Sequence, residues 1–494
     1  MMHFDLVVIG SGPAGYTAAI RALDFSKNVC IVEANHLGGT GVMNGALTSK
    51  TMWELSHDYA VAASVDRGFR ASGLIVDYQK VRKSIIKAAK TKQLQMLSQI
   101  ETFSSSKSKK GSLTLKFGHA RFVNSEQIEI TKDDKKELVS ADDFIIATGS
   151  RPRDYPGIEV DQSRILNSDG ILNLKEFPER MIIIGSGIIG TEFATIFSNF
   201  KQTEVHLLDR AHRVIPFEDD DISDFVSKNL EKNGVIVHHT ANLRNIKKHD
   251  EYLEVVLDYD DGHSRVIEVD IALISIGRVP NNKDLGLENI GAKTDDRGFL
   301  KIKPNCLLQD CGEKTNIYAA GDITGYAQLV NIAELQGRYV PKTIVKKAQY
   351  PLDYSNMSTL MFFRPEVAAV GMNEKSLQKK GIAYKAAYYS NELVSRAIAM
   401  RNTNGFVKVI ISADGNEKIL GMRAAGPQAS ALIVSIAQLI NQGDSLNEVM
   451  RVVHPHPSIT EGIQECLRIL KGKSIFKPEA FPYLIKVWEW EPSK

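Results

Sequence analysis

The sequence predicts an α/β fold in which two Rossmann-like dinucleotide-binding domains are followed by a smaller α+β domain. A glycine-rich turn between a buried strand and a helix occurs near the N-terminus, and it occurs again near residue 185. From Pro351 the pattern changes: STLMFFRPEVAAVG, GFVKVIIS and KILGMRAAG predict strands, and SALIVSIAQLINQG predicts a helix. A chain of 494 residues also exceeds the size of one hydrophobic core, so several domains are expected.

The N-terminal segment FDLVVIGSGPAGYTAAIRA has the pattern of a dinucleotide-binding βαβ unit. A buried strand leads into Gly10, Gly12 and Gly15, and the next strand, NVCIVEA, ends in the acid Glu33. The glycines allow the tight turn, the approach of the backbone to a pyrophosphate and the packing of helix on strand. The helix N-terminus attracts the phosphates, and Glu33 accepts hydrogen bonds from ribose hydroxyls.

The same pattern recurs in RMIIIGSGIIGTEFATIF, with Gly185, Gly187 and Gly190, and the strand VHLLD ends in Asp209. Two such fingerprints in one chain predict two dinucleotide sites. Asp209 is expected to accept from the 2′-hydroxyl of an adenosine ribose, which favours NAD(H) and repels a 2′-phosphate.

Two arginines leave NADP(H) as an alternative to NAD(H). Arg210 and Arg213 follow Asp209 closely and could reach a phosphate, so NADP(H) remains a possible second substrate.

Three further landmarks contain glycines at the ends of apolar segments. They are Thr148 and Gly149 in FIIATGSRP, Gly277 and Arg278 in LISIGRVPN, and Gly321 and Asp322 in NIYAAGDITG. A helix is expected from about Leu329.

Composition argues against several other functions. The net charge is +2, from 61 basic and 59 acidic residues, which gives no reason to invoke nucleic acid. No apolar run approaches the roughly 20 residues that span a bilayer, and the first strand begins too early for a leader, so a cytoplasmic location is expected. The four cysteines form no CxxC pair, and we expect free thiols and no metal site. SSSKSKK, at 104–110, is expected to be an exposed loop.

In this order the landmarks resemble the flavoprotein disulfide reductases, and dihydrolipoamide dehydrogenase most of all, up to about residue 475. The resemblance implies an FAD-binding domain at 1–155 and 275–350, an NAD(P)-binding domain at 156–274 and a dimerisation domain at 351–475, in a homodimer. It leaves 476–494 as a C-terminal extension, whose aromatic segment FPYLIKVWEWEPSK is expected to pack over the subunit surface or, alternatively, to contact a membrane or a partner. The first fingerprint would hold FAD, Asp322 would bond its ribityl chain, and the following helix would point its positive end at the flavin pyrimidine.

One segment departs from the family pattern GGTCxxxGCxPSK, because here it reads GGTGVMNGALTSK. The matching positions are Gly38, Gly39, Thr40, Gly45, Ser49 and Lys50. The two cysteine positions are Gly41 and Ala46, and the proline is Thr48. Neither glycine nor alanine can act as a nucleophile or carry electrons, so dithiol–disulfide exchange is not expected.

The resemblance also implies catalytic residues. Lys50 matches the family lysine beside flavin N5, and Glu192 matches its ion-pair partner. The segment VVHPHPSITEGIQE is similar to the family HxHPTxxE motif, which makes His456 the acid–base histidine and Glu461 the residue that orients it, acting in the other subunit's site. Without thiols, His456 could protonate a reduced acceptor, or the pair could be structural.

FFRPEVAAVG and SNELVSRAIAMRNTNGFVK resemble the NAD(P)H:quinone reductase branch. We therefore expect electrons to pass from NADH through FAD to a quinone or similar small acceptor. A soluble transhydrogenase and a flavin-bearing scaffold of a larger dehydrogenase complex are the alternatives.

Overall fold

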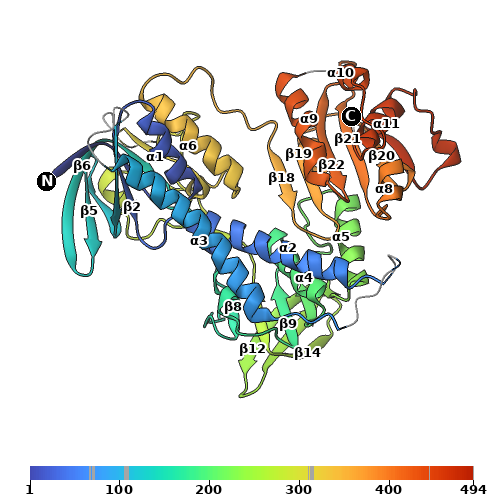
Figure 1. Ribbon diagram of the computed structural model, residues 1–494, viewed down its shortest axis with the longest axis horizontal. Helices are drawn as coiled ribbons and strands as arrows, with labels where there is room; N and C mark the ends of the chain where they lie inside the picture. The colour runs from blue at the N-terminus through green and yellow to red at the C-terminus, as the bar shows by residue number, and fades with distance from the viewer. Residues whose placement is uncertain are drawn as a thin grey trace. The chain divides into compact units, whose positions relative to one another are not determined.

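The computed structural model describes residues 1–492 except 66–67, 69–72, 105–110, 310, 312–315 and 444–445. The expected loop at 104–110 therefore lies outside the described residues from position 105 onward. The chain forms two compact units (Figure 1). Unit 1 comprises Met1–Leu55, Ala71–Phe177 and Ile276–Leu352, and unit 2 comprises Ser56–Arg70, Pro178–Ser275 and Asp353–Lys494. The domain boundaries expected from the sequence stay a prediction.

Unit 1 is built on a seven-stranded sheet in the order β3-β2-β1-β6-β5-β4, with β17 also pairing with β6. Strands β3, β2, β1, β6 and β17 are parallel, and β5 and β4 are antiparallel. The strands are β1 (Met2–Ile9), β2 (Asn28–Glu33), β3 (Ser112–Phe117), β4 (His119–Asn124), β5 (Gln127–Lys132), β6 (Lys135–Ile146) and β17 (Ile317–Ala319).

Strand β1 is apolar on both sides because both faces of the sheet are covered. Leu6 and Val8 pack into one buried cluster, which includes residues of helix α1, whereas Val7 and Ile9 pack into another. This alternation explains why the sequence shows a continuous apolar run at this strand.

The helices of unit 1 cover the sheet and carry the glycine-rich segments. They are α1 (Pro13–Leu23), the π-helical turn η1 (Thr40–Asn44), the first part of α2 (Ala46–Ala62), α3 (Tyr78–Phe103) and α6 (Val330–Ile344). Helices α1 and α6 lie side by side (Figure 1) and approach closely at Gly337, where a Cβ atom would lie 2.4 Å from the carbonyl oxygen of Ala14. The smaller elements are β7 (Ser150–Pro152), β8 (Ile165–Asn167), β16 (Arg278–Pro280), η2 (Ser168–Asn173), η3 (Leu287–Ile290) and η4 (Asp322–Thr324).

Unit 2 contains the second fingerprint on four parallel strands in the order β11-β10-β9-β15. These strands are β9 (Arg180–Ile184), β10 (Glu204–Leu208), β11 (Ile236–His238) and β15 (Ile271–Ile274). Helices α4 (Ile188–Phe200) and α5 (Asp220–Lys232) follow β9 and β10. A three-stranded antiparallel sheet is made of β12 (Ala241–Lys248), β13 (Leu253–Tyr259) and β14 (Ser264–Val269).

The C-terminal part of unit 2 is a six-stranded antiparallel sheet in the order β18-β19-β22-β21-β20-β23. Its strands are β18 (Ser358–Met361), β19 (Val367–Gly371), β20 (Tyr384–Ser390), β21 (Phe406–Ser412), β22 (Ile419–Ala425) and β23 (Ile485–Trp490). Its helical segments are α7 (Glu374–Lys379), η5 (Asn391–Leu393), α8 (Ser395–Ala399), α9 (Ala429–Gln442), α10 (Leu446–Arg451), α11 (Glu461–Leu470) and η6 (Pro478–Ala480). The α/β fold with a C-terminal α+β domain predicted from the sequence is confirmed. The aromatic tail is part of this sheet, because β23 pairs with β20 along its edge.

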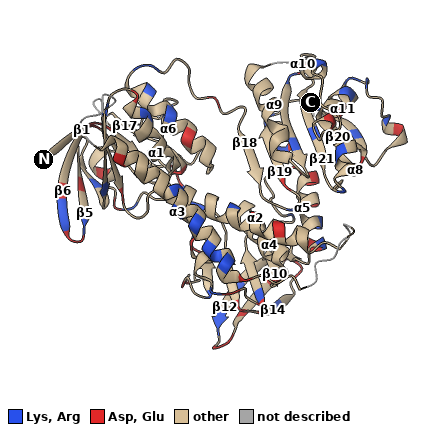
Figure 2. Ribbon diagram, in the orientation of Figure 1, with Lys and Arg blue, Asp and Glu red and all other residues tan. Residues whose placement is uncertain are grey.

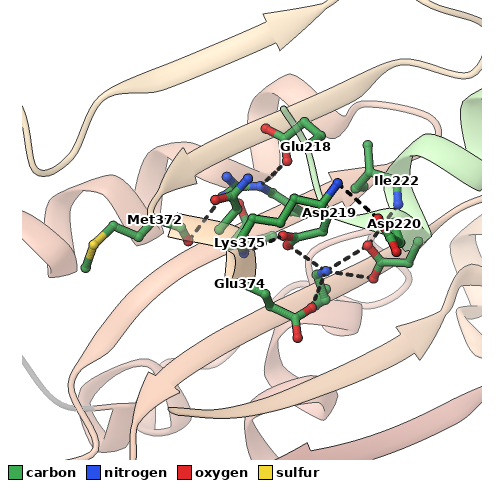
Figure 3. A network of polar contacts seen from close by, with 12 residues as sticks. Glu218, Asp219, Asp220, Ile222, Met372, Glu374 and Lys375 are labelled. Atoms are coloured by element: carbon green, nitrogen blue, oxygen red, sulfur yellow. Dashed lines mark hydrogen bonds and ion pairs between the residues drawn. The ribbon is translucent and has the colours of Figure 1, made fainter. Parts of the chain in front are cut away.

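A buried polar network holds the N-terminus of α5 against the C-terminal sheet (Figure 3). The ammonium of Lys408 is fully buried and lies 2.8 Å from Asp219, 2.7 Å from Asp221 and 2.7 Å from Glu374. Beside it, Nε of Arg423 lies 2.8 Å from Glu218. Each cation thus balances the negative charge of the carboxylates beside it, which would be costly to bury alone in the low-dielectric interior.

The tail strand joins this network at Glu374. Its Oε2 accepts hydrogen bonds from Trp488 Nε1 on β23 and from the Tyr384 hydroxyl, both at 2.7 Å. Three donors, from Lys408, Tyr384 and Trp488, therefore surround the carboxylate of Glu374.

Charges of both signs are distributed over both units (Figure 2), in keeping with the small net charge. Among the helices that the structure describes, none is long and apolar enough to cross a membrane.

Candidate functional site: two dinucleotide-binding loops

The first fingerprint forms the turn between β1 and α1. Gly10 has φ +100°, and a Cβ atom there would lie 2.4 Å from the carbonyl oxygen of Ala147. A Cβ at Gly15 would lie 2.0 Å from the carbonyl oxygen of Gly10, so only glycine allows the helix to pack this closely. At Gly12, no atom of the described residues lies within 4 Å of the Cβ position. The backbone is therefore open where a pyrophosphate would approach, and the loop fits a dinucleotide.

Glu33 is buried at the end of β2 and is fixed by the same loop. Its Oε2 accepts from the amide of Ser11 at 2.9 Å and from the Ser11 hydroxyl at 2.6 Å, and its Oε1 accepts from the amide of Asn35 at 2.8 Å. A carboxylate oxygen has more than one lone pair, so Glu33 keeps the capacity to accept from a ribose hydroxyl.

The second fingerprint repeats this geometry between β9 and α4. Gly185 has φ +104°, and a Cβ at Gly190 would lie 2.0 Å from the Gly185 carbonyl oxygen. The Cβ position of Gly187 faces open space, with nothing in the described part of the chain within 4 Å. Asp209 Oδ2 accepts from the amide of Ser186 at 2.6 Å and from its hydroxyl at 2.7 Å. Glu33 and Asp209 are thus held by equivalent serines in two loops that both read Gly-Ser-Gly.

The arginines after Asp209 differ in their surroundings. Arg213 lies 2.9 Å from Asp224 and 3.4 Å from Asp220, and these carboxylates raise its pKa, most of all because Arg213 donates a hydrogen bond to Asp224. Arg210 is exposed. Arg213, in the loop before α5, is therefore already paired with two acids of that helix.

Loops at the carboxyl ends of β6 and β17 lie next to the first fingerprint. Asn281 ties the Thr148 loop, because its carbonyl accepts from the Thr148 hydroxyl at 2.7 Å and its amide nitrogen donates to the Gly149 carbonyl at 3.0 Å. Gly149 and Gly277 have φ +71° and +109°, which favour glycine. A Cβ at Gly321 would lie 3.0 Å from that of Ala14, so this loop contacts the start of α1.

Asp322 and Arg278 share one serine. The Ser150 hydroxyl donates to Asp322 at 2.6 Å and accepts from Arg278 Nε at 2.8 Å. Burial raises the pKa of Asp322, although the Ser150 hydrogen bond and the charge of Arg278 act in the opposite direction. Burial lowers the pKa of Arg278, and the charges of Asp322 and Asp169 oppose that change.

The segment GGTGVMNGALTSK, which was predicted to match the family cysteine motif, forms the turn η1 and the start of α2. Gly39 has φ +50°, and its Cβ position lies 3.1 Å from Gly12 Cα, which brings Thr40 next to the first fingerprint. A Cβ at Gly41 would lie 2.4 Å from Cγ of Pro13. Ala46 is the first residue of α2.

Lys50 and Glu192 fall in different units, so their predicted ion pair stays a prediction. Lys50 Nζ donates to the Ser49 hydroxyl at 3.4 Å. Glu192 is buried on α4 and accepts from the amide of Phe362 at 3.1 Å.

The structure brings the predicted histidine and glutamate together. His456 Nδ1 lies 2.8 Å from Glu461 Oε1, and Glu461 Oε2 accepts from the amide of Ser458 at 2.8 Å. Burial raises the pKa of Glu461, but these two hydrogen bonds together with the charges of His456 and His454 lower it below its ordinary value. The His456 side chain is 68% exposed in this chain, so its Nε2 edge is open to a reactant.

All four cysteines are buried and none is in a disulfide. Burial raises the pKa of Cys30, Cys306 and Cys466 to about 12, so these thiols stay protonated and unreactive.

Sequence reasoning missed Ser11, Ser186 and Ser150, although the signal was present. The first two stand between the glycines of both fingerprints, and Ser150 follows the Thr148–Gly149 pair. Each serine holds a carboxylate that the motif does name.

Comparisons with known proteins agree with this geometry. Residues 4–337 match the family described as pyridine nucleotide-disulphide oxidoreductase, and 357–467 match the dimerisation domain of that family. Dihydrolipoyl dehydrogenase of Bacillus subtilis is 30% identical over 95% of this chain and 97% of its own length. That of Staphylococcus aureus is 31% identical over 93% of this chain and 95% of its own.

Solved structures share the fold. LpdA from Mycobacterium tuberculosis has a TM-score of 0.85 at 24% identity, covering 95% of this chain and 100% of that one. The HOCl-induced flavoprotein disulfide reductase RclA from Escherichia coli, as its Cu(II) complex, has a TM-score of 0.83 at 23% identity with the same coverage. The chain therefore belongs to the pyridine nucleotide-disulphide oxidoreductase family of flavoprotein oxidoreductases, for which FAD and NAD(H) are the expected cofactors.

Proposed function

We propose that this chain is an NADH-dependent flavoprotein reductase that passes electrons to a quinone or a similar small acceptor without a redox disulfide. FAD, when bound, accepts two electrons from the reduced nucleotide and passes them on, which is the chemistry that the cofactor supplies. The protein's part is to bind and orient the two nucleotides and to supply protons.

The observation that carries the proposal is the contact between Gly41 and Pro13. A cysteine needs a Cβ atom, and at position 41 that atom would lie 2.4 Å from Pro13 Cγ. The other family cysteine position is Ala46, and Cys30, Cys306 and Cys466 are buried thiols with pKa values raised to about 12. The residues at these two positions and the short Cβ distance at Gly41 support a reductase that works without a redox disulfide.

The residues that would hold FAD are those of the first fingerprint and its neighbouring loops. They are Gly10, Gly12, Gly15, Glu33, Gly39, Thr40, Thr148, Gly149, Gly321 and Asp322. Gly185, Gly187, Gly190 and Asp209 would hold the pyridine nucleotide, with Gly277 and Arg278 in the loop that follows that region. Asp209 supports NADH over NADPH, because Arg213 is engaged by Asp220 and Asp224.

His456 and Glu461 support a protonating role toward the acceptor. Glu461 fixes Nδ1 of the imidazole at 2.8 Å, which leaves Nε2 to hold a proton for a reduced oxygen. The match to a dimerisation domain supports a homodimer in which this pair serves the other subunit.

An acceptor screen tests the proposal. FAD-loaded protein is assayed with NADH and with NADPH against benzoquinones, lipoamide and a thio-NAD analogue. Fast NADH oxidation with quinones and none with lipoamide is expected. Lipoamide turnover would contradict the loss of disulfide chemistry, NADPH-to-thio-NAD exchange as the dominant activity would indicate a transhydrogenase, and slow turnover with every acceptor would indicate a scaffold.

A further inference from the structure

Four polar side chains form a continuous hydrogen-bonded chain beneath the loop that carries Asp209. His206 Nε2 lies 3.1 Å from Glu204 Oε1, and His206 Nδ1 lies 2.9 Å from His238 Nε2. His238 Nδ1 lies 2.6 Å from the hydroxyl of Tyr259. Both histidines are buried, with 3% of each residue exposed, and their rings stack with centroids 5.2 Å apart.

One arrangement of protons satisfies every member of this chain. The carboxylate of Glu204 accepts at one end, so the donors point toward it, and the Tyr259 hydroxyl at the other end donates to His238 Nδ1. His238 then donates from Nε2 to His206, and His206 donates from Nε2 to Glu204. Both imidazoles are neutral in this arrangement, in agreement with burial, which lowers the pKa of each of them.

These four hydrogen-bonded side chains connect three strands next to Asp209. His206 lies on β10, His238 ends the short edge strand β11, and Tyr259 ends β13. Strand β11 has only three residues, so its backbone ladder is short. The His238 side chain adds a hydrogen bond to His206 on β10 and one to Tyr259 on β13.

The same turn holds the backbone of Asp209 from both sides. The amide of Asp209 donates to the His238 carbonyl at 3.1 Å, and its carbonyl accepts from the amide of Ala241 at 3.1 Å. Ala241 is the direct ladder partner of Tyr259. The two residues that hold the backbone of Asp209 are thus His238 itself and Ala241, the ladder partner of Tyr259.

We propose that His238 and Tyr259 are positioning residues for nucleotide selection, which fix the turn that holds Asp209 and so set its carboxylate against the adenosine ribose. The inference rests on the proposed role of Asp209. A displaced Asp209 accepts less well from the 2′-hydroxyl of NAD⁺, so NAD⁺ binding weakens. It also repels the 2′-phosphate of NADP⁺ less, so NADP⁺ binding weakens by a smaller factor than NAD⁺ binding.

The test measures the affinity of FAD-loaded protein for NAD⁺ and for NADP⁺ by calorimetry. Tyr259→Phe removes a single hydroxyl and is expected to reduce the selectivity for NAD⁺ roughly 3- to 10-fold, the range of one hydrogen bond. His238→Ala is expected to reduce it further. The matched control is Tyr252→Phe, at the residue directly before the opposite end of β13, which should leave the selectivity unchanged. A purely structural role would weaken binding of both nucleotides together and would overturn the proposal.

A double-mutant cycle separates the two levels of the argument. Asp209→Ala alone should lower the selectivity about 10-fold or more, because a charged partner is lost. In that background Tyr259→Phe should change nothing further. If Asp209→Ala has no effect, the proposed role of Asp209 is wrong. If Asp209→Ala lowers the selectivity and Tyr259→Phe does not, or if Tyr259→Phe acts equally in both backgrounds, the positioning role is wrong.

Discussion

The Cβ position of Gly41 lies 2.4 Å from Cγ of Pro13, the first residue of helix α1. Real Cβ contacts are essentially never this short, and Gly41 does not have the positive φ that favours glycine elsewhere in this segment. The obstacle to a side chain at position 41 is therefore the pyrrolidine ring of Pro13 and not the backbone conformation.

Gly41→Ala should lower the free energy of unfolding by about 1–3 kcal/mol, the usual cost of overpacking. Denaturant unfolding of the FAD-loaded protein measures this change. Pro13→Ala removes the ring atoms at 2.4 and 3.0 Å, so the Gly41→Ala substitution should cost much less in a Pro13→Ala background. Equal costs in both backgrounds would show that Pro13 is not the obstacle.

Anaerobic reduction should consume two electrons per subunit, because without a redox disulfide the flavin alone is expected to store electrons. A disulfide enzyme takes up twice as many and shows long-wavelength absorbance from a thiolate against the flavin. Dithionite titration with absorbance detection checks both properties. Uptake of four electrons per subunit would mean that buried cysteines take part after all.

His456→Gln should slow acceptor reduction by about 10²–10⁴-fold if His456 supplies the proton, while flavin reduction by NADH stays nearly unchanged. Stopped-flow measurement of the two half-reactions separates these effects. His454→Gln, two residues earlier in the same motif, is the matched control and should have the smaller effect. If the His456→Gln enzyme turns over as fast as wild type, only a structural role remains for the pair.

Lys408→Met should destabilise the protein by about 3–5 kcal/mol at neutral pH, because Asp219, Asp221 and Glu374 lose their buried cation. Burial raises the pKa of Asp221 in the folded state, and without Lys408 the charge that opposes this rise is lost. A raised folded-state pKa gives stability that is present at low pH and lost as pH rises. Denaturation at pH 5 and pH 8 should therefore show a smaller penalty at pH 5; a penalty that is independent of pH would argue against this account.

The buried histidine pair should make the folded state sensitive to acid. Burial, and after it the charges of His206, Arg265 and His239, lower the pKa of His238 to about 4. An unfolded histidine titrates near pH ~6.5, so the unfolded state binds the extra proton between these values. Stability should fall as pH decreases from about 6.5 to 4. His238→Gln should flatten this dependence in chemical denaturation, and an unchanged slope would remove His238 as its source.

Local sequence pattern was sufficient for the two dinucleotide loops. Gly10, Gly12 and Gly15 are needed within one turn, and the acid Glu33 follows at the end of the next strand, so the fingerprint lies within a short stretch of chain. The His456–Glu461 pair was predictable for the same reason, since one turn and one helix start bring the two side chains together.

Contacts between distant segments were decided only by the tertiary structure. The three carboxylates around Lys408 come from the N-terminus of α5 and from α7, and the partners of His238 come from β10 and β13. The tail forms strand β23 by pairing with the edge of β20. The alternation of residues within FPYLIKVWEWEPSK does not identify that partner strand. Periodicity reports which face of an element is buried, whereas the identity of the neighbour on that face depends on how the whole chain packs. The sequence by itself therefore determined the family and the two nucleotide loops, and it predicted Gly41 and Ala46 at the positions where the resemblance expects cysteines. Packing alone decided that the Pro13 ring lies against Gly41 and that the buried histidine pair lies next to Asp209.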